Sequence, residues 1–308
     1  MDKNVYMINN YKNIAKEFQE EGKFIKALRF FRKAYGMEGG KYDIELLLDM
    51  ALVYDGLGDI IKAEEKYREI LDIDPDEARA YYGLAILYDD RKDYGSAIQY
   101  YKRAIQIDEY YDRAYFFLAN IYDEIGEKEN AILCYKKTIA LKPDDFWAHT
   151  NLGSIYEEIN EHNMAIEMME KSLELIPNHH IPLFNMGVIY KGLGEIEKAQ
   201  HYYRLSIKEE PCYPYSFLNL AIIYKEQQDY KRAIDIITKG IMYNEDTSVL
   251  YYNRACCYIH GDAFEKALRD IITATQLSPS LVEYVLKDEE LDPIKELKAF
   301  KLMFHKNS

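Results

Sequence analysis

The chain has 308 residues, and its 53 acidic residues against 39 basic ones give a formal net charge of -14. This excess of negative charge opposes binding to phosphate backbones and to anionic lipid, so we expect neither nucleic acid nor a membrane surface as a partner. No apolar run approaches the roughly 20 residues that span a bilayer, and no apolar secretion segment follows Met1, so we expect a cytoplasmic protein.

After a short leader, residues 1–7, the chain repeats one pattern of two helices. In the stretch 112–145, apolar residues recur at i, i+3, i+4 and i+7 on both sides of Gly126, which predicts helix, turn, helix. Pro143 ends the second helix, because proline lacks an amide hydrogen and disfavours a helical residue before it. The pattern predicts an array over residues 8–281, with repeats beginning near residues 8, 44, 78, 112, 146, 180, 214 and 248.

Three classes of position keep a period of 34 residues through this array. The first helices share a tyrosine, from Tyr54 to Tyr258, and the second helices share an alanine, from Ala63 to Ala267. The first helices also share a small residue, which lets two helices approach closely: Ala51, Ala85, Ala119, Gly153, Gly187, Ala221 and Ala255. The first junction is longer by two residues, near Gly39 and Gly40. The fixed period favours one array over separate globular domains.

The pattern changes after Pro279. Residues 282–308 are predicted to form C-terminal capping helices, with one helix over 282–287 and a second from Pro293 to about Phe304. The second places Ile294, Leu297, Phe300 and Leu302 to cover the open end of the array.

In these features the chain resembles the tetratricopeptide-repeat (TPR) family, and the resemblance covers nearly all of it. The resemblance implies an all-α fold, a right-handed α-solenoid of about eight helix-turn-helix units with a C-terminal capping helix. It also implies a concave groove that binds extended peptide segments. In the family this groove is lined by positions 2, 5, 6, 9 and 12, counted from the first residue of each repeat.

Position 6 is asparagine in each of the last four predicted repeats: Asn151, Asn185, Asn219 and Asn253. Because asparagine offers both an acceptor and a donor, this ladder could hold a peptide backbone without reading its side chains. It resembles the asparagine ladder in the TPR arm of protein O-linked N-acetylglucosaminyl transferases. The alternative is that asparagine is ordinary composition at this position of the repeat. Asp49, Gly83 and Phe117 interrupt the series in repeats two to four.

Position 12 carries Asp89, Asp123 and Glu157, which belong to a set of carboxylates at the carboxyl ends of the first helices. The helix dipole disfavours negative charge there, so helix stability does not explain the set. A partly basic partner segment explains it, and solvation of an exposed edge is the competing explanation. Lys191 and Lys225 reverse the charge at this position in repeats six and seven.

Position 5 carries aromatic residues in several repeats: Phe116, Phe184 and Tyr252 are predicted groove residues. Such rings either anchor apolar side chains of a partner or pack between neighbouring repeats.

No motif predicts catalysis, a cofactor or a metal site. Gly56 and Gly58 lie before a second helix and lack the third glycine and the lysine of a phosphate loop, and the cysteines lack zinc spacing. The family's clamp for a C-terminal carboxylate is incomplete, because Asp49 stands where that carboxylate would lie. We therefore predict a non-catalytic scaffold that binds an extended, partly basic segment of another protein. Two alternatives are a sensor whose superhelix responds to a small signalling peptide and a self-associating structural protein; the oligomeric state is open.

Overall fold

The computed structural model describes residues 3–304; the ends of the predicted leader and capping segment, 1–2 and 305–308, lie outside the described residues. Over this range the chain forms nineteen α-helices, two short 3-10 helices and no strand. None of these helices combines the length and apolar content that a bilayer span requires. The chain divides into two compact units, the first ending at Ala148 and the second beginning at His149, inside α9 (Phe146–Glu158).

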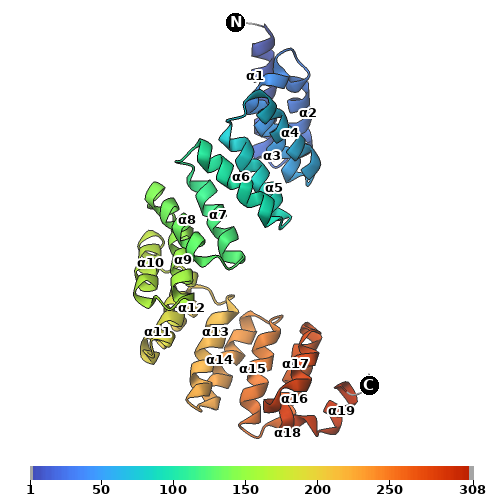
Figure 1. The fold of residues 1–308 in the computed structure, drawn as a ribbon. Helices are drawn as coiled ribbons and strands as arrows, with labels where there is room; N and C mark the ends of the chain where they lie inside the picture. Colours follow the sequence, from blue (N-terminus) through green and yellow to red (C-terminus); the bar gives the residue numbers. More distant parts are fainter. Residues whose placement is uncertain (1–2, 305–308) are drawn as a thin grey trace. The chain divides into compact units, whose positions relative to one another are not determined.

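In the first unit the helices follow one another in pairs, and the members of a pair lie side by side (Figure 1). The second helices of the first three pairs also contact the first helix of the next pair, so the four pairs form a stack. The helices are α1 (Lys3–Glu20), α2 (Phe24–Tyr35), α3 (Ile44–Gly56), α4 (Ile60–Ile73), α5 (Ala78–Asp90), α6 (Tyr94–Ile107), α7 (Asp112–Glu124) and α8 (Lys128–Leu141).

Local sequence sets these boundaries. Asp43, Asp59 and Asp93 cap α3, α4 and α6, because each side chain accepts a hydrogen bond from a backbone amide of the first turn. The turn between α7 and α8 contains Gly126 at φ +80°, a conformation that favours glycine. The first helices α3, α5 and α7 begin at the residues where the period places repeat starts.

The repeated small residues form the contact between the helices. Ala51, Ala85 and Ala119 on the first helices are 0% exposed, and so are the repeated second-helix alanines Ala63 and Ala97. Larger side chains at these positions would separate the two helices of a pair, since a close-packed interior has few voids. The 34-residue period therefore determines which face of each helix is buried.

The first junction differs from the others, as its two extra residues predict. Gly39 adopts φ +89°, and a 3-10 helix, η1 (Gly40–Tyr42), leads into α3. A Cβ atom on Gly40 would lie 2.1 Å from the carbonyl oxygen of Ala34, so only glycine fits there. At the amino end, the predicted leader is not separate from the array, because α1 already begins at Lys3.

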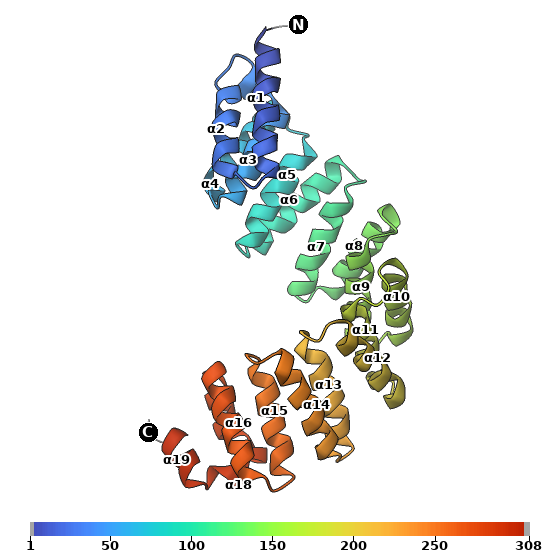
Figure 2. The same ribbon diagram turned by 180° about the vertical axis from the view of Figure 1, so that it is seen from behind.

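The second unit contains the larger part of α9 together with α10, three further pairs and the C-terminal segment. From α13 to α16 the helices lie side by side, as both views show (Figure 2). The helices are α10 (His162–Leu175), α11 (His180–Gly192), α12 (Ile196–Glu209), α13 (Pro214–Glu226), α14 (Tyr230–Tyr243), α15 (Ser248–Ile259), α16 (Phe264–Leu277), α17 (Leu281–Lys287), α18 (Asp292–Lys295) and α19 (Lys298–Phe304), with η2 (Glu289–Leu291) after α17.

The prediction of one continuous capping helix from Pro293 to Phe304 is wrong. The segment breaks into α18 and α19, and this break allows both Ile294 and Phe300 to be fully buried. Leu302, which was expected to cover the end of the array, is 52% exposed. Periodicity alone misassigned this segment because its apolar residues satisfy a helical spacing while the chain turns between Lys295 and Lys298.

The buried small-residue positions can be tested by overpacking. We expect Ala119→Leu to lower the free energy of unfolding by about 1–3 kcal/mol, because the added atoms have no space between α7 and α8. The matched control is Ala140→Leu, which makes the same change at an exposed position of α8 and leaves stability nearly unchanged. Urea unfolding followed by circular dichroism measures both. Equal stability of the two variants would contradict the packing described here.

Candidate functional site

The first unit contains an open cleft built from the predicted groove positions. It has a volume of about 270 Å³ and lies between α3 and α5. Its walls come from positions 2, 5, 6 and 9 of repeats two and three, with Tyr67 and Tyr111 of the same repeats and Arg113 of repeat four. The lining residues are Glu45, Leu48, Asp49, Leu52, Tyr67, Arg79, Tyr82, Gly83, Ile86, Tyr111 and Arg113. The repeat positions that line the groove in the family therefore face an accessible surface here. We call this the first cleft.

Packing explains why glycine, and not asparagine, stands at position 83. A Cβ atom on Gly83 would lie 2.2 Å from the ring of Tyr67, so the tyrosine fills the space that a position-6 side chain would occupy. In the next repeat Phe117 stands at this position, and its ring stacks on Tyr101 at 6.4 Å. Tyr101 follows Tyr67 by one repeat. The side chain at position 6 therefore has to fit the tyrosine that packs against it from the second helix of the preceding repeat.

A second cleft adjoins the first and shares Tyr82 and Arg113 with it. It has a volume of about 280 Å³ and is lined by Tyr82, Asp112, Arg113, Phe116, Phe117, Lys142, Asp145 and Trp147. Phe116 is a predicted groove residue and lies in this wall. Trp147 is 47% exposed, a large apolar area for a surface residue. The lining of this second cleft is half aromatic and half charged.

Most charges in the two clefts are paired. Arg79 lies 2.8 Å from a carboxylate oxygen of Glu45 and 2.7 Å from one of Glu77. Lys142 pairs with Asp145 at 3.0 Å, and Asp49 pairs with Lys16 at 3.1 Å. Burial raises the pKa of Asp49, although Lys16 acts in the opposite direction. Within residues 3–304, Arg113 has neither an ion pair nor a hydrogen bond from its side chain.

Carboxylates gather at the other ends of the same first helices. We call this set, Asp55, Asp89, Asp90 and Glu124, the carboxylate edge. Burial raises the pKa of Asp89, and the nearby Asp90 and Glu124 carboxylates raise it further, against a smaller opposing effect of the Tyr101 hydroxyl. Burial also raises the pKa of Asp55, with Asp90 adding to it. The edge is therefore a place where negative charges are held together at a cost to folding.

Asp123, predicted with Asp89 as a charge contact, has a partner within its own repeat. Its carboxylate lies 2.6 Å from the ammonium group of Lys128. The lysine lies at the start of α8, so one turn connects the two residues. Asp123 is thus compensated in the folded chain, whereas the Asp89 carboxylate faces other negative charges.

In the second unit a third cleft brings three predicted residues together. It has a volume of about 270 Å³ and is lined by Ser154, Glu157, Glu158, Phe184, Asn185 and Val188. Burial raises the pKa of Glu157, and Glu158 raises it further. The Phe184 ring meets the Tyr213 ring edge to face at 5.2 Å, so this predicted anchor also packs between repeats.

The predicted asparagine ladder uses part of its hydrogen-bonding capacity inside the protein. The side-chain amide nitrogen of Asn185 donates to the Ser154 hydroxyl at 3.0 Å and to the Met169 sulfur at 3.9 Å, and its oxygen remains as an acceptor. The side-chain amides of Asn219 and Asn253 donate to backbone carbonyls one turn earlier in their own helices, at 3.0 Å and 2.8 Å. Asn151 lies half-buried on α9. A side-chain amide carries two donor hydrogens and an acceptor oxygen, so these bonds leave each of the three with further capacity.

The last predicted groove aromatic, Tyr252, binds the chain's own C-terminal segment. Its hydroxyl donates to the Asp288 carboxylate, and its ring meets the Tyr284 ring at 5.5 Å. Glu290, two residues after Asp288, lies 2.7 Å from Lys225 and 2.8 Å from the His260 ring. Lys225 and also Lys191, which pairs with Glu226 at 2.8 Å, are thus compensated within the fold.

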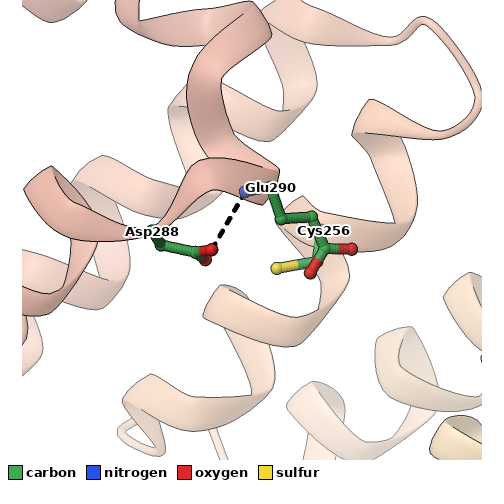
Figure 3. A group of neighbouring side chains, drawn as sticks. All are labelled: Cys256, Asp288 and Glu290. Atoms are coloured by element: carbon green, nitrogen blue, oxygen red, sulfur yellow. Dashed lines mark hydrogen bonds between the residues drawn. The ribbon is translucent and has the colours of Figure 1, made fainter.

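Cys256, Asp288 and Glu290 lie close enough to suggest a metal site (Figure 3). Their chemistry argues against one. Burial, helped by the Glu290 charge, raises the pKa of the Cys256 thiol to about 12, so the thiolate that a metal needs is disfavoured. The carboxylates already accept hydrogen bonds from Tyr252, Lys225 and His260. The Lys225 ammonium supplies the positive charge that a metal ion would bring.

Comparisons with known proteins identify the family. Models described as tetratricopeptide repeat match residues 48–112, 148–179, 182–211 and 216–247, and a model described as TPR repeat matches residues 119–160. Together with the helical repeat solenoid, these matches show that the chain belongs to the tetratricopeptide-repeat family.

Solved structures of similar fold support this. A tetratricopeptide repeat protein from Parabacteroides merdae is 20% identical, with a TM-score of 0.65, over 81% of this chain and 98% of that chain. YrrB, described as a TPR protein with an unusual peptide-binding site, is 21% identical, with a TM-score of 0.54, over 60% of this chain and 95% of its own. At these identities the likeness concerns the fold.

A curated protein is similar over a short segment. The heat shock protein sti1 homolog of Schizosaccharomyces pombe is 40% identical over 53 residues, which are 17% of this chain and 9% of that protein. The chain thus matches less than a tenth of that relative's length.

The raised pKa of Asp89 predicts a pH-dependent effect of its removal. Folding disfavours the charged form, so the penalty is fully present above the folded pKa and is lost as the pH falls to about 3.8, the ordinary value for aspartate. We expect Asp89→Asn to raise the unfolding midpoint in urea at pH 7 and to lose this advantage below pH 3.8. The exposed Asp144→Asn serves as the control. A midpoint that stays the same or falls at pH 7 would argue against a strained carboxylate edge.

Proposed function

We propose that this TPR protein is a non-catalytic scaffold that holds an extended, partly basic segment of another protein against its first helices. The observation that carries the proposal is the pair of open clefts in the first unit, formed by the positions that the family uses for peptides. Their exposed apolar walls fit partner side chains, and large exposed apolar patches mark interaction sites.

The charge of the proposed partner follows from the carboxylate edge. Asp89 is held beside Asp90 and Glu124 at helix ends where the dipole also disfavours negative charge. A lysine or arginine of the partner would relieve this repulsion and would add electrostatic attraction at a distance. Glu157 and Glu158 offer the same chemistry in the third cleft of the second unit.

Asparagine would add contacts that do not depend on partner sequence. Asn185 lies in the third cleft beside Glu157 and Phe184, so backbone, charge and apolar contacts are available in one place. Asn151, Asn219 and Asn253 would extend this role along the repeats. The likeness to YrrB, whose description names a peptide-binding site, is consistent with this function.

Selection from a peptide library tests the proposal without a known partner. The purified full chain is immobilised and panned against random dodecapeptides displayed on phage. We expect the recovered peptides to be enriched in lysine and arginine over the input library, and their binding to weaken with added salt, because exposed charges are screened. Failure to enrich any peptide, or enrichment of peptides with a net negative charge, would contradict the proposal.

The asparagine contribution is measured on a recovered peptide. We expect Asn185→Ala with Asn219→Ala to weaken binding about tenfold, the effect of losing one or two hydrogen bonds. Asn163→Ala, at an exposed position of the second helix α10, is the control. An unchanged dissociation constant in the double variant would remove the ladder from the account and leave the clefts as the site.

A further inference from the structure

Arg113 lies where the two clefts of the first unit meet. It is the second residue of α7, it is exposed, and it lines both clefts together with Tyr82. Its side chain makes no ion pair or hydrogen bond with any residue in the range 3–304. The neighbouring cations differ in this respect, because Arg79 and Lys142 are paired with carboxylates.

The position of Arg113 in its helix is unfavourable for folding. A helix amino terminus carries partial positive charge, so a cation in the first turn is repelled by the dipole. Asp112 precedes it and lines the second cleft, but no ion pair or hydrogen bond joins the two side chains in the part of the chain described. Among the described residues, no carboxylate pairs with Arg113 and accounts for its place in the fold. Arginine is well suited to a carboxylate, because its planar guanidinium donates two parallel hydrogen bonds.

Apolar surface flanks this guanidinium on both sides. In the first cleft Leu52 is 52% exposed, and the Tyr82 and Tyr111 rings lie 4.9 Å apart. In the second cleft Phe116, Phe117 and Trp147 supply the apolar part of the lining, beside the paired Lys142 and Asp145. Each cleft has the volume of a large side chain or more, so each can receive one apolar residue.

We propose that the two clefts bind a single extended segment that places an apolar side chain in each cleft and an aspartate or glutamate between them, on Arg113. In an extended chain, residues i, i+2 and i+4 point to the same side. The recognised core is therefore apolar, any residue, acidic, any residue, apolar. This inference rests on the proposed scaffold function and refines it, because the basic residues that face the carboxylate edge lie outside this five-residue core.

The arrangement favours an internal acidic side chain over a chain end. Clefts lie on both sides of Arg113, so a segment that ended at the guanidinium would leave one cleft empty. Asp49, half-buried in the first cleft, further disfavours a terminal carboxylate placed deeper in that cleft.

Synthetic peptides test the proposal by fluorescence anisotropy with the full chain. The probe is a fluorescein-labelled peptide with phenylalanine at the first and fifth core positions, glutamate at the third, and serine elsewhere. We expect replacement of the glutamate by lysine to weaken binding at least tenfold, because it places two cations together. Arg113→Ala should remove this difference, and Arg113→Glu should reverse it in favour of the lysine peptide.

The control is Arg103→Ala, which removes an exposed arginine of α6 that pairs with Asp76. It should retain the preference for glutamate, and far-ultraviolet circular dichroism verifies that each variant is folded. Absence of a reversal with Arg113→Glu would overturn the proposal. Tighter binding of a peptide that ends at the glutamate would also overturn it, by assigning the site to a chain terminus.

The same peptides distinguish a failure of the scaffold function from a failure of the Arg113 site. Library peptides that bind equally well to Arg113→Ala would leave the scaffold function intact and refute this inference. A chain that binds neither library peptides nor the designed probe would refute both.

Discussion

The close contact between small residues is the constraint on which the rest of this structure depends. Ala51, Ala85 and Ala119 are completely buried, and each brings a first helix against its second helix. Once that contact is fixed, the helical period determines which positions remain on the open face. In the first unit those positions form two clefts rather than a flat surface. Tyrosines of the second helices, such as Tyr67, pack against the first-helix positions from below and line the clefts.

Charges on the open face show a conflict between folding and binding. α7 carries Arg113 in its first turn, while Glu124 lies in its last turn, and the helix dipole opposes both. Some charges at the ends of the first helices are paired, as Asp123 is with Lys128 and Lys225 is with Glu290. The unpaired arginine and the crowded carboxylate edge differ from these pairs, and local conflicts of this kind are typical of functional surfaces. A partner of mixed charge would satisfy both.

The sequence predicted the parts of the fold that depend on local spacing. The 34-residue period placed the starts of α3, α5, α7, α11, α13 and α15, because a repeated helix pair can bury its apolar face in only one way. It did not predict the break between α18 and α19, which depends on packing of Ile294 and Phe300 against the last repeat. Periodicity contains no information about a turn that tertiary contacts impose.

For the candidate site residues, the sequence predicted which positions line clefts. It did not predict which of these residues form hydrogen bonds and ion pairs within the fold. Phe116, Glu157, Phe184 and Asn185 line clefts, as their positions suggest. Tyr252 binds Asp288, and Lys225 binds Glu290. These contacts depend on the path of the C-terminal segment, which the spacing of residues in the sequence does not predict. Arg113 was not predicted, because its place at the junction of two clefts depends on the packing of neighbouring repeats. Its signal was an arginine in the first turn of a helix, beside aromatic residues at positions 5 and 6.

Photo-crosslinking tests the central claim most directly. A benzophenone amino acid is placed at Ile86, in the first cleft, or at Leu133, a 65% exposed residue of the second helix α8. Each variant is irradiated with a peptide recovered from the library. The account predicts a crosslinked product from position 86 and none from position 133. Crosslinking from position 133 alone would show that partners bind the other face of the repeats and would contradict the account.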